Sequence, residues 1–151
     1  MASAGKGGNG IDKLSIVVFS GDYDRVHYAL ATAAAACAVG KAVTLFFTMG
    51  ATRALLGPRP DGTPGWTGLE APGDDGPPKV RDAHRRNAGI GGMEELIVAC
   101  AELGATFMVC EMGLRIARVA PETLRSDVTI AEGGIVTFLG DASRDGAMLL
   151  V

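Results

Sequence analysis

The chain has 151 residues, of which 48% are hydrophobic, and its formal net charge is −3. That length suffices for one hydrophobic core and is short for two ordinary domains, so we expect a single domain. Acidic and basic residues are mixed along the chain without a basic stripe, which argues against nucleic acid as a partner. No apolar run approaches the ~20 residues that span a bilayer, and the small, polar residues 1–10 lack the apolar centre of a signal peptide. We therefore expect a cytoplasmic protein with a flexible tail over residues 1–10.

The first half of the chain begins with a strand, a helix and a second strand. Residues 14–19 (Leu-Ser-Ile-Val-Val-Phe) form a β-branched run with little alternation, which is typical of a strand buried on both faces of a parallel sheet. Residues 20–22 turn the chain and offer a helix cap, and apolar residues then recur at helical spacing as far as Cys37. Gly40 ends this helix, and residues 43–47 repeat the buried-strand pattern.

The segment from residue 57 to residue 92 has a different composition. It holds six of the seven prolines, many glycines and the only tryptophan, Trp66. No regular element is predicted for most of it. We expect residues 57–79 to form a loop insert that is solvated by its acidic side chains and contributes little to the core.

The second half of the chain continues the alternation of helices and strands. It predicts, in order, a helix from Met93 to Gly104, a strand over 106–110, a short helical stretch from about Met112, a brief strand over 128–130, a helix carrying Ile135, Phe138 and Leu139, and a final strand over 147–151. Such alternation implies right-handed crossovers. The predicted fold class is therefore α/β: residues 11–151 form one domain with a doubly wound, mostly parallel sheet of about five strands, with helices on both faces in a flavodoxin-like layering.

Three cysteines in a chain without an export signal indicate free thiols. With only His27 and His84 as histidines, no spacing suggests a metal site, and we expect no metal and no cofactor. Cys37 and Cys100 each lie on the apolar face of a predicted helix, which favours a packing role.

Cys110 is the candidate for chemistry. It is the last residue of the third predicted strand, and ligands and reactive groups gather beyond the carboxyl ends of parallel strands. The start of the following helix would favour a thiolate, whereas the neighbouring Glu111 opposes a second negative charge. The alternative is that Cys110 is a small buried hydrophobic residue at a strand end.

Other residues expected at the same edge of the sheet form a possible pocket around Cys110. They are Glu111, Met112 and Gly113, which follow it; His27 and Tyr28, near the start of the first helix; Met49, after the second strand; and Trp66, in the insert. The simpler interpretation of His27 and Tyr28 is that they are ordinary surface residues.

The region around Cys110 also resembles a known family. Residues 107–114 (Phe-Met-Val-Cys-Glu-Met-Gly-Leu) and 129–139 (Thr-Ile-Ala-Glu-Gly-Gly-Ile-Val-Thr-Phe-Leu), together with 45–48 (Leu-Phe-Phe-Thr), are similar to the DsrE/DsrF-like group, often labelled peroxiredoxin-like. The resemblance implies that Cys110 accepts a persulfide sulfur and passes it on, and relatives often have serine where this chain has Gly113. It also implies a homo-oligomer, a trimer or hexamer, whose partners are sulfur-donor and sulfur-acceptor proteins or small persulfides.

Three functional hypotheses follow from the sequence. The first is an intracellular sulfur carrier or sulfurtransferase that acts through Cys110. The second is a non-catalytic oligomeric interaction module in which Cys110 is structural. The third is a flavodoxin-like nucleotide or flavin binder, suggested by the glycine-rich residues 89–92 before a helix.

Overall fold

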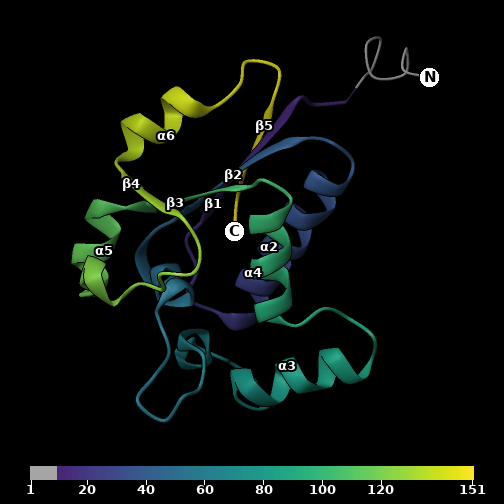
Figure 1. Ribbon diagram of the computed structural model, residues 1–151, viewed down its shortest axis with the longest axis vertical. Helices are drawn as coiled ribbons and strands as arrows, with labels where there is room; N and C mark the ends of the chain where they lie inside the picture. The colour runs from purple at the N-terminus through teal and green to yellow at the C-terminus, as the bar shows by residue number, and fades with distance from the viewer. Residues whose placement is uncertain (1–9) are drawn as a thin grey trace.

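The computed structural model describes residues 10–151, so the predicted tail lies outside the described residues except for Gly10. Those residues form one α/β domain around a five-stranded sheet with the order β4-β3-β2-β1-β5 (Figure 1). Every neighbouring pair of strands is parallel. The predicted fold class is confirmed. Within residues 10–151, no helix combines the length and apolar character needed to cross a membrane.

Strands and helices alternate along most of the chain. In order, the elements are β1 (Lys13–Val18), α2 (Tyr23–Ala38), β2 (Ala42–Phe47), η1 (Met49–Leu55), η2 (Gly65–Gly68), α3 (Pro78–Asn87), α4 (Met93–Glu102), β3 (Thr106–Cys110), α5 (Glu111–Ala117), η3 (Pro121–Thr123), β4 (Ile130–Gly133), α6 (Ile135–Asp141) and β5 (Ala147–Leu150). The predicted strand over 128–130 is shifted, because Val128 is buried without joining the ladder and pairing with β3 begins at Ile130.

The two faces of the sheet are covered to different extents. Successive side chains of a strand point to opposite faces. From β3, Phe107 and Val109 join the larger core cluster, which α2 and α4 complete, whereas Met108 and Cys110 join a smaller cluster with Phe138 of α6. Figure 1 shows α2 and α4 side by side on one side of the sheet and α6 on the other. Cys110 therefore lies on the face that only α6 covers among the described helices.

The insert over residues 57–79 packs into the core, so the expectation that it contributes little there is wrong. Trp66 is 4% exposed and Leu69 is 5% exposed, and both belong to the larger cluster. A single turn of 3₁₀ helix, η2, carries Trp66 inward until its ring centroid lies 5.9 Å from that of Tyr23. At Gly65, a Cβ would stand 2.4 Å from the carbonyl oxygen of Leu56, so only glycine permits this approach. The prolines and glycines of the insert prevent a long helix or a strand of the sheet, but they do not prevent the burial of side chains such as Trp66.

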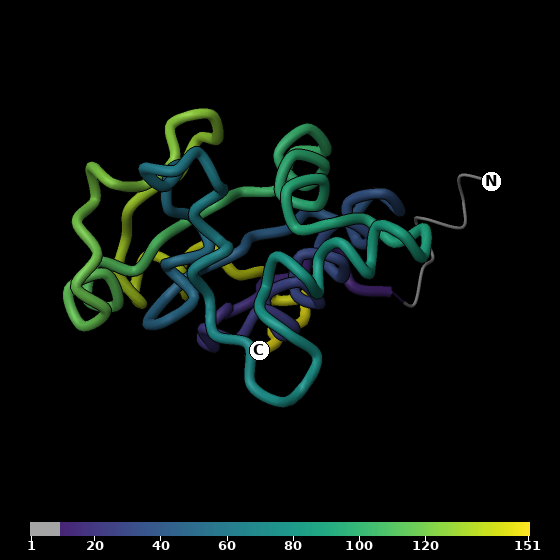
Figure 2. Tube along the Cα trace, turned by 90° about the horizontal axis from the view of Figure 1, so that it is seen from below, coloured from purple at the N-terminus to yellow at the C-terminus, as the bar shows by residue number. Residues whose placement is uncertain are grey.

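Helix α3 is an element that the sequence pattern does not predict, since no regular element is expected for most of residues 57–92. Pro78 instead opens the helix, where a residue without an N–H is well tolerated. Arg81 of α3 is 3% exposed; it pairs with Asp24 of α2 at 2.5 Å and donates to the carbonyl oxygen of Gly76 at 2.6 Å. Figure 2 shows the insert starting beside the segment after α5 and ending at α3. The insert is thus tied to the domain at both ends.

Candidate functional site at the end of β3

Cys110 ends β3 and serves as the N-cap of α5. Its Sγ atom accepts a hydrogen bond from the backbone N–H of Gly113 at 3.4 Å. This N–H is one of the groups that the start of a helix leaves without an intrahelical partner. A donor at this place would support negative charge on the sulfur. The predicted position of Cys110, at the tip of the third strand and before a helix, is confirmed.

Cys110 is buried in the smaller apolar cluster, to which α6 contributes Phe138. Cys110 is 1% exposed and packs with Phe46, Met108 and Phe138. The rings of Phe46 and Phe138 stack with their centroids 4.6 Å apart, and Phe138 is the buried residue of α6. The other large side chains of α6 point outward, and Val136 is 84% exposed. A reagent therefore reaches Cys110 only if the packing of this cluster opens.

The end of β2 and the start of α5 meet in close contact at Gly113. A Cβ on Gly113 would lie 2.3 Å from Oγ1 of Thr48 and 2.6 Å from the backbone nitrogen of Met49. Met49 itself has a φ of 50°, which is uncommon for a residue other than glycine. The bare α-carbon of Gly113 is thus required by the neighbouring chain. Gly113 therefore lies beside Met49 and donates to Cys110, so the structure places these three predicted residues close to the end of β3.

The remaining residues of the predicted pocket are exposed or lie elsewhere. Glu111 and Met112 follow Cys110 in the first turn of α5, and Met112 is 50% exposed. Tyr28 of α2 is 71% exposed, in agreement with the simpler surface interpretation.

His27 is 5% exposed and packs against Tyr23, so its interpretation as an ordinary surface residue is wrong. Tyr23 and Trp66 belong to the larger core, whereas Cys110 belongs to the smaller cluster on the other face of the sheet. Nε2 of His27 donates to the carbonyl oxygen of Gly91 at 2.8 Å. Burial lowers the pKa of His27, so its ring is held in the neutral form. Nε1 of Trp66 donates to Oε1 of Glu94 at 3.1 Å. The structure does not gather these two residues around the thiol.

Thr48 and Phe138 are contacts of the site that sequence reasoning missed. Phe47 pairs with Val109, and Thr48 and Cys110 are the next residues on the two neighbouring strands. Thr48 has an extended backbone, with φ −141° and ψ 166°, so it continues the alternation and shares the face of Cys110. The sequence signal that could have identified Thr48 is its position directly after a predicted strand. That signal places Thr48 next to Cys110 only when the register between β2 and β3 is known.

The other two thiols lie in less reactive surroundings. Cys100 is 0% exposed, its Sγ donates to the carbonyl oxygen of Leu30 at 3.4 Å, and burial raises its pKa to about 12. Burial also raises the pKa of the Cys37 thiol. Since the thiolate is the nucleophile, both groups are held in the unreactive protonated form at neutral pH.

The glycine-rich loop before α4 is occupied by carboxylates of the chain itself. Asp82 accepts a hydrogen bond from the N–H of Met93 at 2.6 Å, and Glu95 accepts one from the N–H of Gly92 at 2.9 Å. A Cβ at Gly92 would stand 2.8 Å from Oδ2 of Asp82. These are the N–H groups that a phosphate would need, and the carboxylates place negative charge there. The geometry therefore offers no support for a nucleotide site in this loop.

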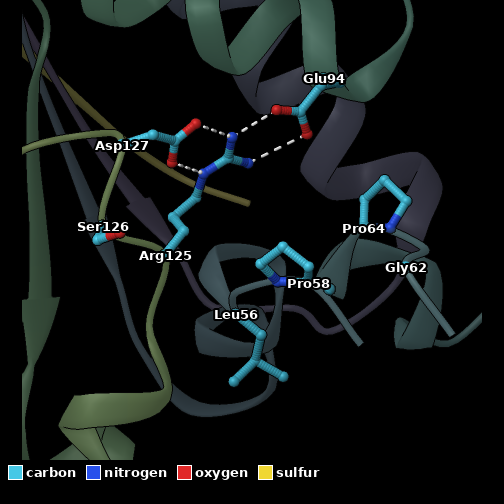
Figure 3. Close-up of a pocket in the computed structure, with 9 residues that line it drawn as sticks. Leu56, Pro58, Gly62, Pro64, Glu94, Arg125, Ser126 and Asp127 are labelled. Atoms are coloured by element: carbon cyan, nitrogen blue, oxygen red, sulfur yellow. Dashed lines mark hydrogen bonds and ion pairs between the residues drawn. The ribbon is translucent and has the colours of Figure 1, made fainter. Parts of the chain in front are cut away.

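A hollow of about 340 Å³ lies between the insert, α4 and the segment after α5 (Figure 3). Apolar walls include Leu56, and Arg125 is held between Glu94 and Asp127. The hydrogen bond with Asp127 is the main cause that raises the pKa of Arg125, and the same bond lowers the pKa of Asp127. Two carboxylates engage this one guanidinium group, so it offers no free charge to an anionic ligand. Arg125 ties the segment after α5 to Glu94 of α4, and Glu94 also accepts a hydrogen bond from Trp66 of the insert.

Comparisons with protein-family models and with curated proteins find no match to this chain. The case for a function therefore depends on the residues and geometry at the end of β3.

Proposed function

We propose that this protein is a cytoplasmic persulfide carrier of the DsrE/DsrF-like kind and that Cys110 carries the sulfur. The observation that best supports the proposal is the hydrogen bond from Gly113 N–H to the Sγ atom at the tip of β3, at 3.4 Å. A thiol in this place has a backbone donor for its negative charge, which neither Cys37 nor Cys100 has among the hydrogen bonds of residues 10–151. Cys110 is therefore the thiol best suited to attack a sulfur atom.

The proposed step is a thiol–persulfide exchange. The Cys110 thiolate attacks the outer sulfur of a donor persulfide, R–S–SH, and a new bond forms between Sγ and that sulfur. The sulfur–sulfur bond of the donor breaks, and R–S⁻ leaves with the electron pair. Cys110 then carries –S–SH, and an acceptor thiolate attacks the outer sulfur to regenerate the Cys110 thiolate. No external oxidant or reductant is consumed, because one sulfur atom moves between thiols.

Burial of Cys110 fits a carrier that protects its cargo between partners. A persulfide exposed to solvent is open to attack by any thiol, whereas Cys110 is 1% exposed within a cluster that includes Phe138 of α6. In the proposal, α6 moves aside when a donor or acceptor arrives and closes again after transfer. The ring stack between Phe46 and Phe138 is the contact that must open.

Apolar surface beside the site supports the further proposal that the carrier is a homo-oligomer. On α6 and β5 the exposed apolar side chains are Ile135, Val136, Leu139, Met148, Leu149 and Leu150. Exposed apolar side chains are costly to leave in water, and a partner subunit would cover part of them. We expect sedimentation equilibrium at micromolar concentration to show a trimer or hexamer, and Val136→Glu to weaken it without lowering stability, since Val136 is 84% exposed. A monomeric wild type would contradict this proposal.

The rival function is a non-catalytic interaction module in which Cys110 is structural. The 1% exposure of Cys110 is the observation in its favour, because a fully covered thiol is usually a packing residue. The two functions differ in one measurable respect. A carrier gains sulfur at Cys110 and gives it up, whereas a structural thiol does neither in the folded protein.

The test is a transfer assay with a small persulfide donor whose outer sulfur is radioactive. The wild type should retain labelled sulfur after desalting and release it to an added acceptor thiol. Cys110→Ser should retain none, and Cys37→Ser, the matched control, should behave as wild type. Phe138→Ala should load and discharge faster, because it removes a ring of the cluster in which the thiol is buried. Equal labelling of wild type and Cys110→Ser would refute the carrier.

A further inference from the structure

Arg125 has one N–H group that its two carboxylate partners do not use. A guanidinium group has five N–H donors in one plane. Among residues 10–151, Nε and Nη2 donate to Asp127, and Nη1 and Nη2 donate to Glu94, so four donors are engaged. The fifth is the second N–H of Nη1, a nitrogen that already has one partner. The side chain that carries this spare N–H is only 9% exposed.

The spare N–H of Arg125 is directed into the hollow between the insert and α4. Asp127 occupies the Nε–Nη2 side of the planar group, and Glu94 occupies the Nη1–Nη2 side. The spare N–H therefore lies on the third side, next to Cδ. Figure 3 shows Pro58 and Pro64 on the side of the guanidinium group that neither carboxylate occupies, and both prolines line the hollow. A fixed donor is thus directed between apolar walls.

The charges around the hollow select the kind of group that can meet this donor. The charged residues that line it are Glu94, Arg125 and Asp127, two carboxylates and one guanidinium group. The excess negative charge repels an anion. A cation beside the spare N–H would meet the positive charge of Arg125. An uncharged oxygen acceptor, such as a carbonyl group, binds the N–H without either repulsion.

We propose that the hollow binds a small uncharged compound whose carbonyl oxygen accepts the spare N–H of Arg125 and whose apolar body packs against the proline rings and Leu56. The volume of about 340 Å³ lies near the lower end of the range for small-molecule sites, ~300–1,000 Å³. Such sites combine mostly apolar walls with a few fixed polar groups. Four hydrogen bonds hold the guanidinium group in place before a ligand arrives, which lowers the cost of binding. The inference does not depend on the carrier function.

The first experiment follows the Arg125 side chain by nuclear magnetic resonance in protein labelled with ¹⁵N-arginine. The signals of Arg125 are those missing from the spectrum of Arg125→Lys. The ligand used is N-methylpyrrolidone, an uncharged five-membered ring with a carbonyl group. N-methylpyrrolidine, a cation at neutral pH, and cyclopentanecarboxylate, an anion, are matched controls. We expect a saturable shift of the Nη1 signals with N-methylpyrrolidone and no saturable shift with either charged ring at the same concentrations.

The second experiment measures the Kd of N-methylpyrrolidone for variants of the hollow. Pro58→Ala removes part of an apolar wall at an exposed residue, so the fold should be kept and the Kd should rise about fourfold, the effect of one buried methylene group. Pro60→Ala is the matched control, because Pro60 is exposed and does not line the hollow, and its Kd should equal that of the wild type. Arg125→Lys keeps the positive charge without the planar donors, so its Kd should rise at least about tenfold.

Three results would overturn the inference. The first is an Nη1 signal of the wild type that does not shift at any concentration of N-methylpyrrolidone. The second is equal affinity of Pro58→Ala and Pro60→Ala, which would place the bound ring elsewhere on the protein. The third is saturable binding of either charged ring with the same shift of Arg125, which would show that the hollow does not select an uncharged acceptor. The first and second results stand even where Arg125→Lys fails to fold, because neither uses the affinity of that variant.

Discussion

Replacing residues 57–79 with a short Gly/Ser linker is expected to abolish cooperative unfolding of the protein. The replacement removes Trp66 and Leu69 from the larger core and exposes the side of Tyr23 that Trp66 covers. It also removes the carbonyl oxygen of Gly76 that binds the buried Arg81. Losses of this kind are comparable with the whole free energy of unfolding of a domain, which is about 5–15 kcal/mol.

The single change Trp66→Ala is the sharper form of this prediction. We expect the free energy of unfolding to fall by roughly 3–5 kcal/mol, as for large aromatic residues removed from a core, with a corresponding shift of the denaturation midpoint. Glu94 would also lose the indole N–H that it accepts at 3.1 Å. Tyr28→Ala is the control, because Tyr28 is 71% exposed and its loss should change stability by less than about 0.5 kcal/mol. Equal effects of the two substitutions in urea denaturation would show that the insert is not part of the core.

Gly113→Ala is expected to lower the free energy of unfolding by about 3 kcal/mol, the upper end of the usual cost of overpacking. The added methyl group would meet Oγ1 of Thr48 at 2.3 Å and the backbone nitrogen of Met49 at 2.6 Å, so the start of α5 must shift away from β2. Displacement of the Gly113 N–H would also weaken its hydrogen bond to Cys110. We therefore expect Gly113→Ala to lose sulfur loading together with stability.

Gly140→Ala is the matched control for this substitution. Gly140 lies in α6, and a Cβ there would meet nothing within 4 Å. Alanine should be neutral or stabilising by about 1 kcal/mol at this helical position. Adding Thr48→Ala to Gly113→Ala should restore only part of the lost stability, because the contact with the backbone of Met49 remains. The prediction fails if Gly113→Ala and Gly140→Ala have the same unfolding midpoint.

The first strands of the sheet could be predicted from the sequence because the apolar residues that mark a buried strand are adjacent in the chain. β1 and β2 are mostly apolar and show little alternation, which is typical of strands covered on both faces. β4, with the sequence Ile-Ala-Glu-Gly, has no such run. Its limits are set by pairing with β3, in which Cys110 stands opposite Gly133. β4 therefore begins at Ile130, two residues after the expected start.

The insert could not be predicted because its burial depends on partners far away in the sequence. Trp66 is buried against Tyr23 and binds Glu94, and neither residue marks the insert itself as part of a core. Arg81 appeared as one charge among several in the sequence, yet its 3% exposure makes it an internal tie to Asp24. The composition of the insert therefore predicted that it forms no strand of the sheet, but it did not predict that Trp66 packs in the core.

The candidate site was predictable only in part, because some of its residues are marked by local sequence features and others are brought in from distant elements. Cys110 could be singled out because its strand and the following helix are local features. Thr48 lies in another strand and Phe138 in a later helix, and their proximity to Cys110 is a product of register and of the crossover after β4. In contrast, Trp66 was expected at the thiol and packs in the other cluster.

The most direct test of the carrier account is to locate the added sulfur. The wild type is loaded with a small persulfide, desalted, unfolded in an alkylating agent that preserves the persulfide, and digested for peptide mass spectrometry. The account predicts one additional sulfur on the peptide that contains Cys110 and none on the peptides that contain Cys37 or Cys100. Additional sulfur on Cys37 or Cys100 in the absence of any on Cys110, or no retained sulfur on any peptide, would contradict it.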